Sequence, residues 1–370
     1  MKLTCSRNVL SSAFQIVGSV VPTRTPKEIL RNVKLTLTEG RATLLGTDQE
    51  VGIRYEIPDV ETDSVGEVLL PTQRVNAILR EVQDDQISLE VNEDALWIRS
   101  SQSEFRLSVE DAAEFPSVAS FEDEDYYLIG GKSLKQAIQR TIFATDVEST
   151  RYALGGVLME VDAEKLTLAA TDSRRLAVCH TTCKAHGNVS EEIGQPVIPA
   201  KAMSLIERSI DNDDEDVKIA IHQNEILVQS GQSTIYARLV EGRFPRYQDV
   251  IPGEYTSKID LVVGPFLSAV RQAMIVTNEE SRGVDFGFDD GTLTLTSVGQ
   301  DVGSSKIALP ISYDGEAVIV TFDPKYVQEF LRVLDSAGPV SLNLVDGNSA
   351  AVFKADENYT YVVMPLSRDD

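Results

Sequence analysis

The sequence predicts an α+β fold made of three copies of one domain, each with two helices and several antiparallel strands. Two observations lead to this prediction. One phrase occurs three times, as ATLLGTDQEVGI at 42–53, LTLAATDSRRLAV at 166–178 and LTLTSVGQDVGS at 293–304. Around it, strand-like alternation and helical spacing follow in the same order each time. We expect the copies at residues 1–120, 128–250 and 257–370.

The segments on either side of the phrase repeat as well. It is preceded by RNVKLTL (31–37), GGVLMEV (155–161) and RGVDFGF (282–288). It is followed by VLLPTQRVNAILREV (68–82), PVIPAKAMSLIERSI (196–210) and VIVTFDPKYVQEFLRVL (318–334). The repeat is far longer than a solenoid unit, so each copy is expected to be a domain in its own right. The acidic EDEDY (122–126) and the segment GEYTSK (253–258) are expected to be solvated linkers.

Two helices are expected in each copy. Val75, Ile78, Leu79 and Val82 form an apolar stripe at helical spacing, and Val327, Phe330, Leu331 and Leu334 repeat it. The six predicted helical windows are 6–18, 72–82, 132–144, 200–210, 265–277 and 324–334. Between them, runs such as ATLLG, ISLEV, LWIRS and FRLSV indicate strands, and DDG at 289–291 indicates a turn.

The composition limits the class of protein. The chain has 370 residues, 42% of them hydrophobic, which is enough for two or three domains. We expect no membrane span and no signal peptide, because no long apolar run occurs. Three cysteines, Cys5, Cys179 and Cys183, cannot form a disulfide framework. These features favour a cytoplasmic protein.

The charge is unevenly distributed. The net charge of −24 argues against nucleic acid as a ligand of the whole surface. The six helical windows, however, contain eleven basic and three acidic residues, a net charge of +8. The rest of the chain contains 23 basic and 55 acidic residues, a net charge of −32. If the helices share one surface, that surface is positive and suits a polyanion.

Motifs for catalysis or cofactors are weak. No phosphate-binding glycine motif occurs, and CHTTCKAH (179–186) fits no common zinc spacing, so we expect neither a cofactor nor a metal. The run DNDDED (211–216) lacks the pattern of a calcium loop. Asp48 and Asp172 would be the acids of a metal-dependent nuclease, but the third copy has Val298-Gly299 there. A turn role for these aspartates is the favoured interpretation.

Several phrases resemble the bacterial DNA polymerase III beta subunits, the beta sliding clamps, over nearly the whole chain. They are ATDSRRLAV (170–178), EGRFPRYQDVIP (241–252), NEESRGV (278–284), YVVMPL (361–366), the opening MKLTCSRNVL and LPTQRVNAIL (70–79). The resemblance implies three clamp domains per chain and a head-to-tail homodimer that closes into a ring around duplex DNA without reading its sequence. It also implies a non-catalytic processivity factor, cytoplasmic and associated with the nucleoid.

The resemblance implies partners and a site for them. The partners would be the replicative polymerase alpha subunit, the clamp-loader complex and other proteins with a clamp-binding motif. Their peptides would bind an apolar cleft formed by Leu154, Thr171, Arg175, Leu176, Pro245, Val250, Val362, Val363, Met364, Pro365 and Leu366. Without the resemblance, Leu154, Leu176 and Val363 would be read as core. Departures from the family pattern are Ser173, Arg174, Asp249 and the terminal Ser367–Asp370.

Two further surfaces follow from the resemblance and the charge count. DNA contacts are expected at Arg24, Arg74, Tyr152, Lys201 and Arg282, and the helical charges add Lys132, Lys135 and Arg140. Such contacts would be to phosphates and therefore independent of sequence. The dimer contact is expected to join Phe105 and Leu107 of one chain to Ile275 and Val276 of the other. A nuclease and an acidic scaffold that binds only proteins remain the alternative functions.

Overall fold

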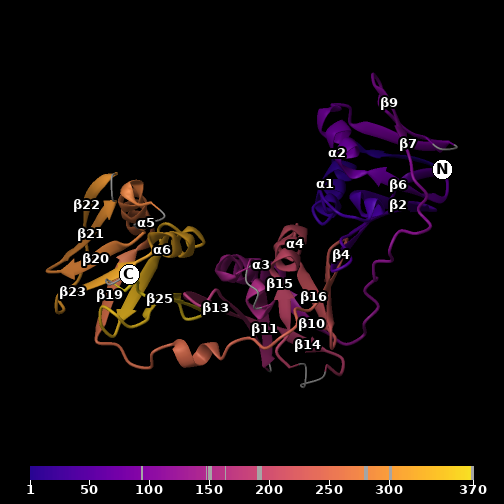
Figure 1. Cartoon of the computed structure of the whole chain (residues 1–370). Helices are drawn as coiled ribbons and strands as arrows, with labels where there is room; N and C mark the ends of the chain where they lie inside the picture. The colour runs from indigo at the N-terminus through magenta and orange to yellow at the C-terminus, as the bar shows by residue number, and fades with distance from the viewer. Residues whose placement is uncertain are drawn as a thin grey trace. The chain divides into compact units, whose positions relative to one another are not determined.

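The computed structural model describes residues 1–92, 95–146, 148, 152–162, 164–189, 194–278, 282–299 and 302–367, without the side chain of Tyr152. The chain forms two compact units, and Figure 1 labels its helices and strands. Unit 1 comprises Met1–Lys135, Cys183–Gly194 and Lys201–Leu239, and unit 2 comprises Gln136–Thr182, Gln195–Ala200 and Val240–Asp370. The middle copy of the repeat therefore contributes strands to both units.

Unit 1 contains two antiparallel sheets. The smaller has the strand order β5-β1-β7-β8-β9, with β1 Lys2–Ser6, β5 Glu61–Ser64, β7 Gln86–Asn92, β8 Ala95–Arg99 and β9 Glu104–Ser108. The larger has the order β14-β10-β16-β17-β18-β4-β3-β2-β6. Its strands are β2 Asn32–Thr38, β3 Arg41–Thr47, β4 Val51–Pro58, β6 Gly66–Pro71, β10 Tyr126–Gly130, β14 Lys184–His186, β16 Asp216–Ile221, β17 Glu225–Ser230 and β18 Ser233–Arg238.

Unit 2 also contains two antiparallel sheets. One has the order β15-β11-β12-β13-β26-β25-β24-β19, with β11 Gly156–Asp162, β12 Lys165–Thr171, β13 Arg175–Thr182, β15 Val197–Pro199, β19 Ser257–Val262, β24 Pro339–Leu344, β25 Ala351–Asp356 and β26 Tyr359–Val363. The other has the order β22-β21-β20-β23, with β20 Val284–Asp289, β21 Thr292–Gly299, β22 Gly303–Pro310 and β23 Val318–Phe322.

The six predicted helices are confirmed within the described residues. They are α1 Arg7–Gly18, α2 Thr72–Glu81, α3 Gly131–Thr141, α4 Ala200–Ser209, α5 Val263–Ala273 and α6 Pro324–Arg332. Helix α1 packs beside α2, and α5 beside α6 (Figure 1). Two predicted windows run beyond the α-helix because 3₁₀ turns follow it, η2 Ile142–Ala144 and η5 Met274–Val276. Three further short 3₁₀ turns are η1 Glu28–Arg31, η3 Tyr152–Gly155 and η4 Tyr247–Val250.

An aromatic core fastens α6 to the large sheet of unit 2. The ring of Phe330 stacks on that of Tyr361 with centroids 4.7 Å apart, and it also packs against Phe353 and Tyr359. All four side chains are fully buried. The hydroxyl of Tyr361 donates to the carbonyl of Tyr326 (3.0 Å), so the buried phenol has a partner. This core holds α6 firmly beside the strand that carries the candidate site.

The predicted linkers are shorter and better held than expected. The last residue of EDEDY, Tyr126, begins β10, and Ser257–Lys258 begin β19. Asp123 lies 3.1 Å from the imidazole of His222, and Asp125 accepts a hydrogen bond from the amide of Asn188 (2.7 Å). The acidic segment before β10 is therefore attached to unit 1 by its own carboxylates.

A candidate peptide cleft beside a buried arginine

The repeated phrase forms the turn between β12 and β13. The Thr171 hydroxyl accepts from the amide of Ser173 (3.1 Å) and donates to the carbonyl of Arg175 (2.6 Å). Oδ1 of Asp172 accepts from the amides of Arg174 and Arg175 at 2.9 and 3.0 Å. Ser173 has φ +74°, in the left-handed region, and the preceding side chains stabilise it there. The predicted turn role of Asp172 is confirmed.

The first copy has the same turn. Oδ1 of Asp48 accepts from the amides of Glu50 and Val51 at 3.0 and 2.8 Å, and Gln49 has φ +81°. The other carboxylate oxygen of Asp48 accepts from Nζ of Lys201. Both aspartates are therefore occupied by local hydrogen bonds, which leaves the nuclease alternative without a catalytic pair. In the third copy, residues 300 and 301 lie outside the described residues.

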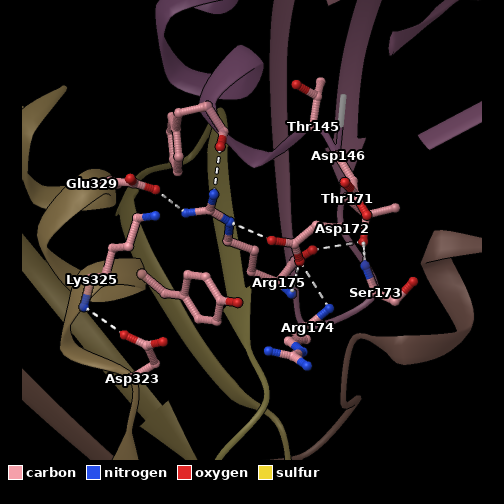
Figure 2. Close-up of polar contacts among 12 residues, drawn as sticks. Thr145, Asp146, Thr171, Asp172, Ser173, Arg174, Arg175, Asp323, Lys325 and Glu329 are labelled. Atoms are coloured by element: carbon pink, nitrogen blue, oxygen red, sulfur yellow. Dashed lines mark hydrogen bonds and ion pairs between the residues drawn. The ribbon is translucent and has the colours of Figure 1, made fainter. Parts of the chain in front are cut away.

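Arg175 is the centre of the site. Its side chain is only 7% exposed. Its guanidinium donates to Asp172 (3.0 Å), to Glu329 of α6 and to the carbonyl of Phe143 (2.6 Å), as Figure 2 shows. It also lies over the ring of Tyr326, 4.6 Å from the centroid. One side chain thus joins β13, η2 and α6.

The charge of Arg175 is well supported. Burial disfavours the charged form, but Tyr361, Glu329 and Asp172 outweigh it, so the pKa of the guanidinium lies above its usual value. A buried cation with its partners in place is stable, whereas removal of one member leaves an uncompensated charge. Arg175 is therefore expected to act as a rigid structural element of the site.

A cleft of about 260 Å³ lies beside this arginine. Its lining comprises Thr171, Ser173, Arg174, Arg175, Leu176, Pro245, Arg246, Tyr247, Val250, Val362 and Met364. Leu176, Tyr247 and Val362 are buried, whereas Val250 is 50% and Met364 44% exposed. Large apolar side chains exposed beside a concave surface are typical of a binding site.

Seven of the predicted cleft residues are among this lining: Thr171, Arg175, Leu176, Pro245, Val250, Val362 and Met364. Leu154 and Val363 do not line the cleft but are buried in the core, in agreement with the alternative interpretation. Pro365 and Leu366 follow β26 and are also outside the lining, and the amide of Leu366 donates to Thr321 (2.8 Å). They leave the cleft because the chain turns toward β23.

Sequence reasoning missed Arg246 and Tyr247 as lining residues. Both belong to RFPRY (243–247), which matches EFPSV (114–118) of the first copy in the order of the repeat. This match was a sequence signal that could have added them to the prediction. The Tyr247 hydroxyl donates to Glu160 (2.7 Å). Burial and this carboxylate raise the pKa of the Tyr247 hydroxyl, which therefore stays protonated as the donor of the hydrogen bond that holds its ring in the cleft wall.

The corresponding place in the first copy is filled. Leu176 pairs with Thr171 across its hairpin, as Gly52 does with Thr47. A Cβ added at Gly52 would lie 3.0 Å from Cγ1 of Val118. Val118 therefore lies where a side chain at position 52 would have to go, so the first copy has no counterpart of the Leu176 side chain there.

The predicted DNA contacts differ in how exposed their side chains are. Arg24, Arg74, Lys132 and Arg282 are exposed. Lys135 donates to Ile210 (3.1 Å) and Asp213 (3.3 Å), and Lys201 donates to Val20 (3.0 Å) and Asp48. The side chain of Tyr152 lies outside the described residues.

Arg140 is the least exposed cation of the predicted set. Its side chain is 11% exposed, pairs with Asp356 at 2.9 Å and lies over the ring of Tyr359. The Asp356 carboxylate and the Tyr359 ring hold the guanidinium inside unit 2, so a contact with a phosphate would require it to leave these partners. The helical charge count overlooked this because the partners come from distant strands.

The residues predicted for a dimer contact lie on an edge strand and in a 3₁₀ turn. Phe105 and Leu107 are half-buried on β9, the edge strand of the five-stranded sheet. Ile275 is 75% exposed and Val276 is half-buried, both in η5. Val298 and Val302, at the nearby β21–β22 hairpin, are 64% and 56% exposed. Apolar exposure on this scale indicates contact surfaces.

The cysteine and histidine cluster is structural where it is described. Burial raises the pKa of the Cys179 thiol to about 11, and His180 is 2.9 Å from the Thr167 hydroxyl. His186 stacks on Tyr126. Within the described residues, no three His, Cys, Asp or Glu side chains gather as metal ligands, and no helix is long and apolar enough to cross a membrane.

Models of the DNA polymerase III beta subunit match the chain in succession: the N-terminal domain at 1–119, the central domain at 128–246 and the C-terminal domain at 248–367. A beta sliding clamp of Pseudomonas aeruginosa is 30% identical over 372 residues, covering 99% of this chain and 100% of its own. One of Chlamydia muridarum is 29% identical over 373 residues and covers 100% of both. The crystal structure of a DnaN sliding clamp from Pseudomonas aeruginosa, bound to griselimycin, has a TM-score of 0.90 at 27% identity and covers 99% of both chains. The predicted fold of three clamp domains is thereby confirmed.

Proposed function

The chain belongs to the DNA polymerase III beta subunit family, and from this premise we propose that it encircles duplex DNA and tethers a replicative polymerase to it. As a sliding clamp it is a non-catalytic processivity factor. The gain is effective concentration: a tethered polymerase rebinds its template before it can diffuse away. The observation that carries this proposal is the match of three domain models in the order of the threefold repeat.

Primer extension tests the proposal. With a partner polymerase, a clamp loader and a trap for dissociated polymerase, addition of the protein should lengthen the product of each binding event. Product lengths unchanged at saturating protein would contradict the proposal. Metal-dependent cleavage of the template that disappears in Asp172→Ala would instead support the nuclease alternative.

We propose a homodimer joined head to tail. A single chain has three domains, and a heterologous contact whose rotation closes gives a ring. The half-buried Phe105 and Leu107 and the exposed Ile275 are candidates for that contact. Light scattering behind a sizing column should give twice the chain mass of 40.6 kDa at several concentrations. A monomer mass at every concentration would contradict the proposed ring.

The partners proposed for the cleft are the polymerase alpha subunit, the clamp loader and other proteins with a clamp-binding motif. The cleft suits an extended peptide with apolar anchors, because its floor is apolar and Val250 and Met364 stand exposed beside it. Arg174 and Arg246 are exposed lining residues, and no carboxylate is among the described lining. In a chain of net charge −24, this favours peptides with an acidic residue beside the anchors.

For DNA we retain Arg24, Arg74, Lys132 and Arg282 as phosphate contacts, with Lys135 and Lys201 as cations shared with nearby acceptors. Tyr152 stays a prediction that rests on the resemblance alone. Arg140 is not retained, since Asp356 already neutralises it. The domain boundaries 1–120, 128–250 and 257–370, and a cytoplasmic location on the nucleoid, complete the proposal.

A further inference from the structure

One cation lies between two acceptors beside the turn of the second copy. Oδ2 of Asp172 and the carbonyl of Phe143 both accept from the guanidinium of Arg175, at 3.0 and 2.6 Å. Phe143 belongs to η2, directly after α3, the first helix of that copy. The place of the cation is therefore formed by the turn aspartate and by a carbonyl just beyond a helix end, where positive charge is favoured.

The first copy has the same pair of acceptors but receives its cation from elsewhere. Oδ2 of Asp48 and the carbonyl of Val20, two residues beyond the end of α1, both accept from Nζ of Lys201. A Cβ added at Gly46 would lie 2.8 Å from the carbonyl oxygen of Val17, so this glycine lets β3 approach the end of α1 closely. The close approach brings Asp48 and Val20 to the same cation.

The sequence explains why the two cations have different sources. Val51 of the first copy corresponds to Arg175 of the second, because each follows its turn aspartate by three residues. With no arginine in the turn, Oδ2 of Asp48 is available to a cation from another segment. Lys201 is the second residue of α4 in the next copy, so this ion pair joins the first copy to the second.

The two cations differ in their exposure. The side chain of Arg175 is 7% exposed, whereas that of Lys201 is 46% exposed. An ammonium has three N–H donors, and the two contacts described use two of them. An exposed ion pair is weak, so a second anion can compete for the lysine. A phosphate group can therefore reach the Lys201 ammonium, whereas the Arg175 guanidinium is enclosed.

We infer that Asp48 restrains Lys201, so that duplex DNA and the junction between the first and second copies compete for the same ammonium. The inference rests on the proposed contact of Lys201 with DNA and adds Asp48 as the residue that weakens it. Without DNA, Lys201 binds the turn and the end of α1. With DNA, a phosphate shares its charge, and by reciprocity DNA then loosens the attachment of Lys201 to the first copy.

Asp48→Asn tests the restraint. Asparagine keeps an oxygen that can accept the two amide hydrogen bonds of the turn, so the fold should be retained. The variant should bind a short, open-ended fluorescent duplex roughly two- to fivefold more tightly at low salt, because loss of one exposed ion pair frees the ammonium. The slope of log K against log salt should steepen by up to about one unit.

Three further variants isolate the pair, since loss of any carboxylate near DNA reduces repulsion. Glu50→Gln removes an exposed carboxylate from the same turn and is the matched control; it should change the affinity less than Asp48→Asn does. Lys201→Met should weaken binding, and in that background Asp48→Asn should add no more than Glu50→Gln adds. Lys201→Arg keeps the charge and should retain binding.

The outcomes separate the inference from the proposed function. A gain from Asp48→Asn that is equal with and without Lys201 would show that Asp48 acts by general repulsion, and the inference would fail. Unchanged binding in Lys201→Met would remove this lysine from the DNA surface and overturn the inference, while the other proposed contacts could still hold DNA. If the unmodified protein binds no duplex at any salt concentration, the proposed function itself fails.

Discussion

Arg175 and Glu329 stand 154 positions apart in the sequence and form an ion pair that fastens β13 to helix α6. The pair lies at the wall of the cleft, and its arginine is nearly fully buried. The shape of the cleft therefore depends on a helix that does not line it. This relationship gives the first prediction.

Glu329→Gln should lower the thermal stability of the protein and weaken peptide binding together. The substitution leaves a buried guanidinium with one fewer charged partner, and breaking such a pair costs about 3–5 kcal/mol when the charge is fully uncompensated. Asp172 remains in place, so we expect a smaller loss. Calorimetry and peptide titration measure the two effects. Lys325→Ala, on the same helix, should leave peptide binding unchanged; an equal loss there would contradict the account.

Met364→Ala and Val250→Ala should each weaken the binding of a partner peptide roughly tenfold, since each removes an apolar contact at the cleft mouth. The dimer mass should not change. Ile319→Ala provides a control, because Ile319 is equally exposed (51%) but outside the cleft. Fluorescence anisotropy with a labelled peptide gives the dissociation constants. If Ile319→Ala were as harmful as the cleft variants, the assignment of the cleft would be wrong.

The arginines of the cleft should confer a preference for acidic peptides. Arg174→Ala with Arg246→Ala should reduce the affinity difference between a peptide with an acidic residue beside its anchors and its amide counterpart. Salt should reduce the same difference in the unmodified protein, because exposed charges are screened. Titration of both peptides at low and high salt measures the effect. An unchanged affinity difference in the double variant would show that these arginines do not distinguish the acidic peptide from its amide counterpart.

Lys132→Ala and Arg140→Ala should separate DNA contact from structural support. Lys132 is exposed, so its loss should lower the salt dependence of DNA association by about one unit of slope or less. Arg140 is paired with Asp356 inside unit 2, so its loss should lower the melting temperature without that change in slope. Salt titrations and thermal scans measure the two quantities. The reverse pattern would place Arg140 on the DNA surface.

The sequence predicted the repeated elements well, because the same phrase recurs with helical and strand periods on either side. The six helices and the turn role of Asp48 and Asp172 depend on local patterns of this kind. It predicted long-range pairing poorly. Nothing near Arg140 in the sequence indicates Asp356, and nothing near Arg175 indicates Glu329, because these partners meet only after distant strands assemble.

The residues of the cleft were also predicted only in part. Leu176, Val362 and Met364 were found through the resemblance, whereas Leu154 and Val363, predicted in the same way, are buried and outside the described lining. Alternating residues of a strand point to opposite faces, so a contiguous phrase such as YVVMPL cannot line one cleft throughout. Applying that period to each matched phrase would have removed Val363 from the prediction.

The central claim, topological tethering, is tested most directly by retention on DNA. The protein is loaded onto nicked circular DNA with a clamp loader, separated from free protein on a sizing column, and the DNA is then cut once. The account predicts that the protein stays with the circle and leaves within minutes of linearisation, unless the ends are blocked by bound protein. Equal retention on circular and open linear DNA would contradict it.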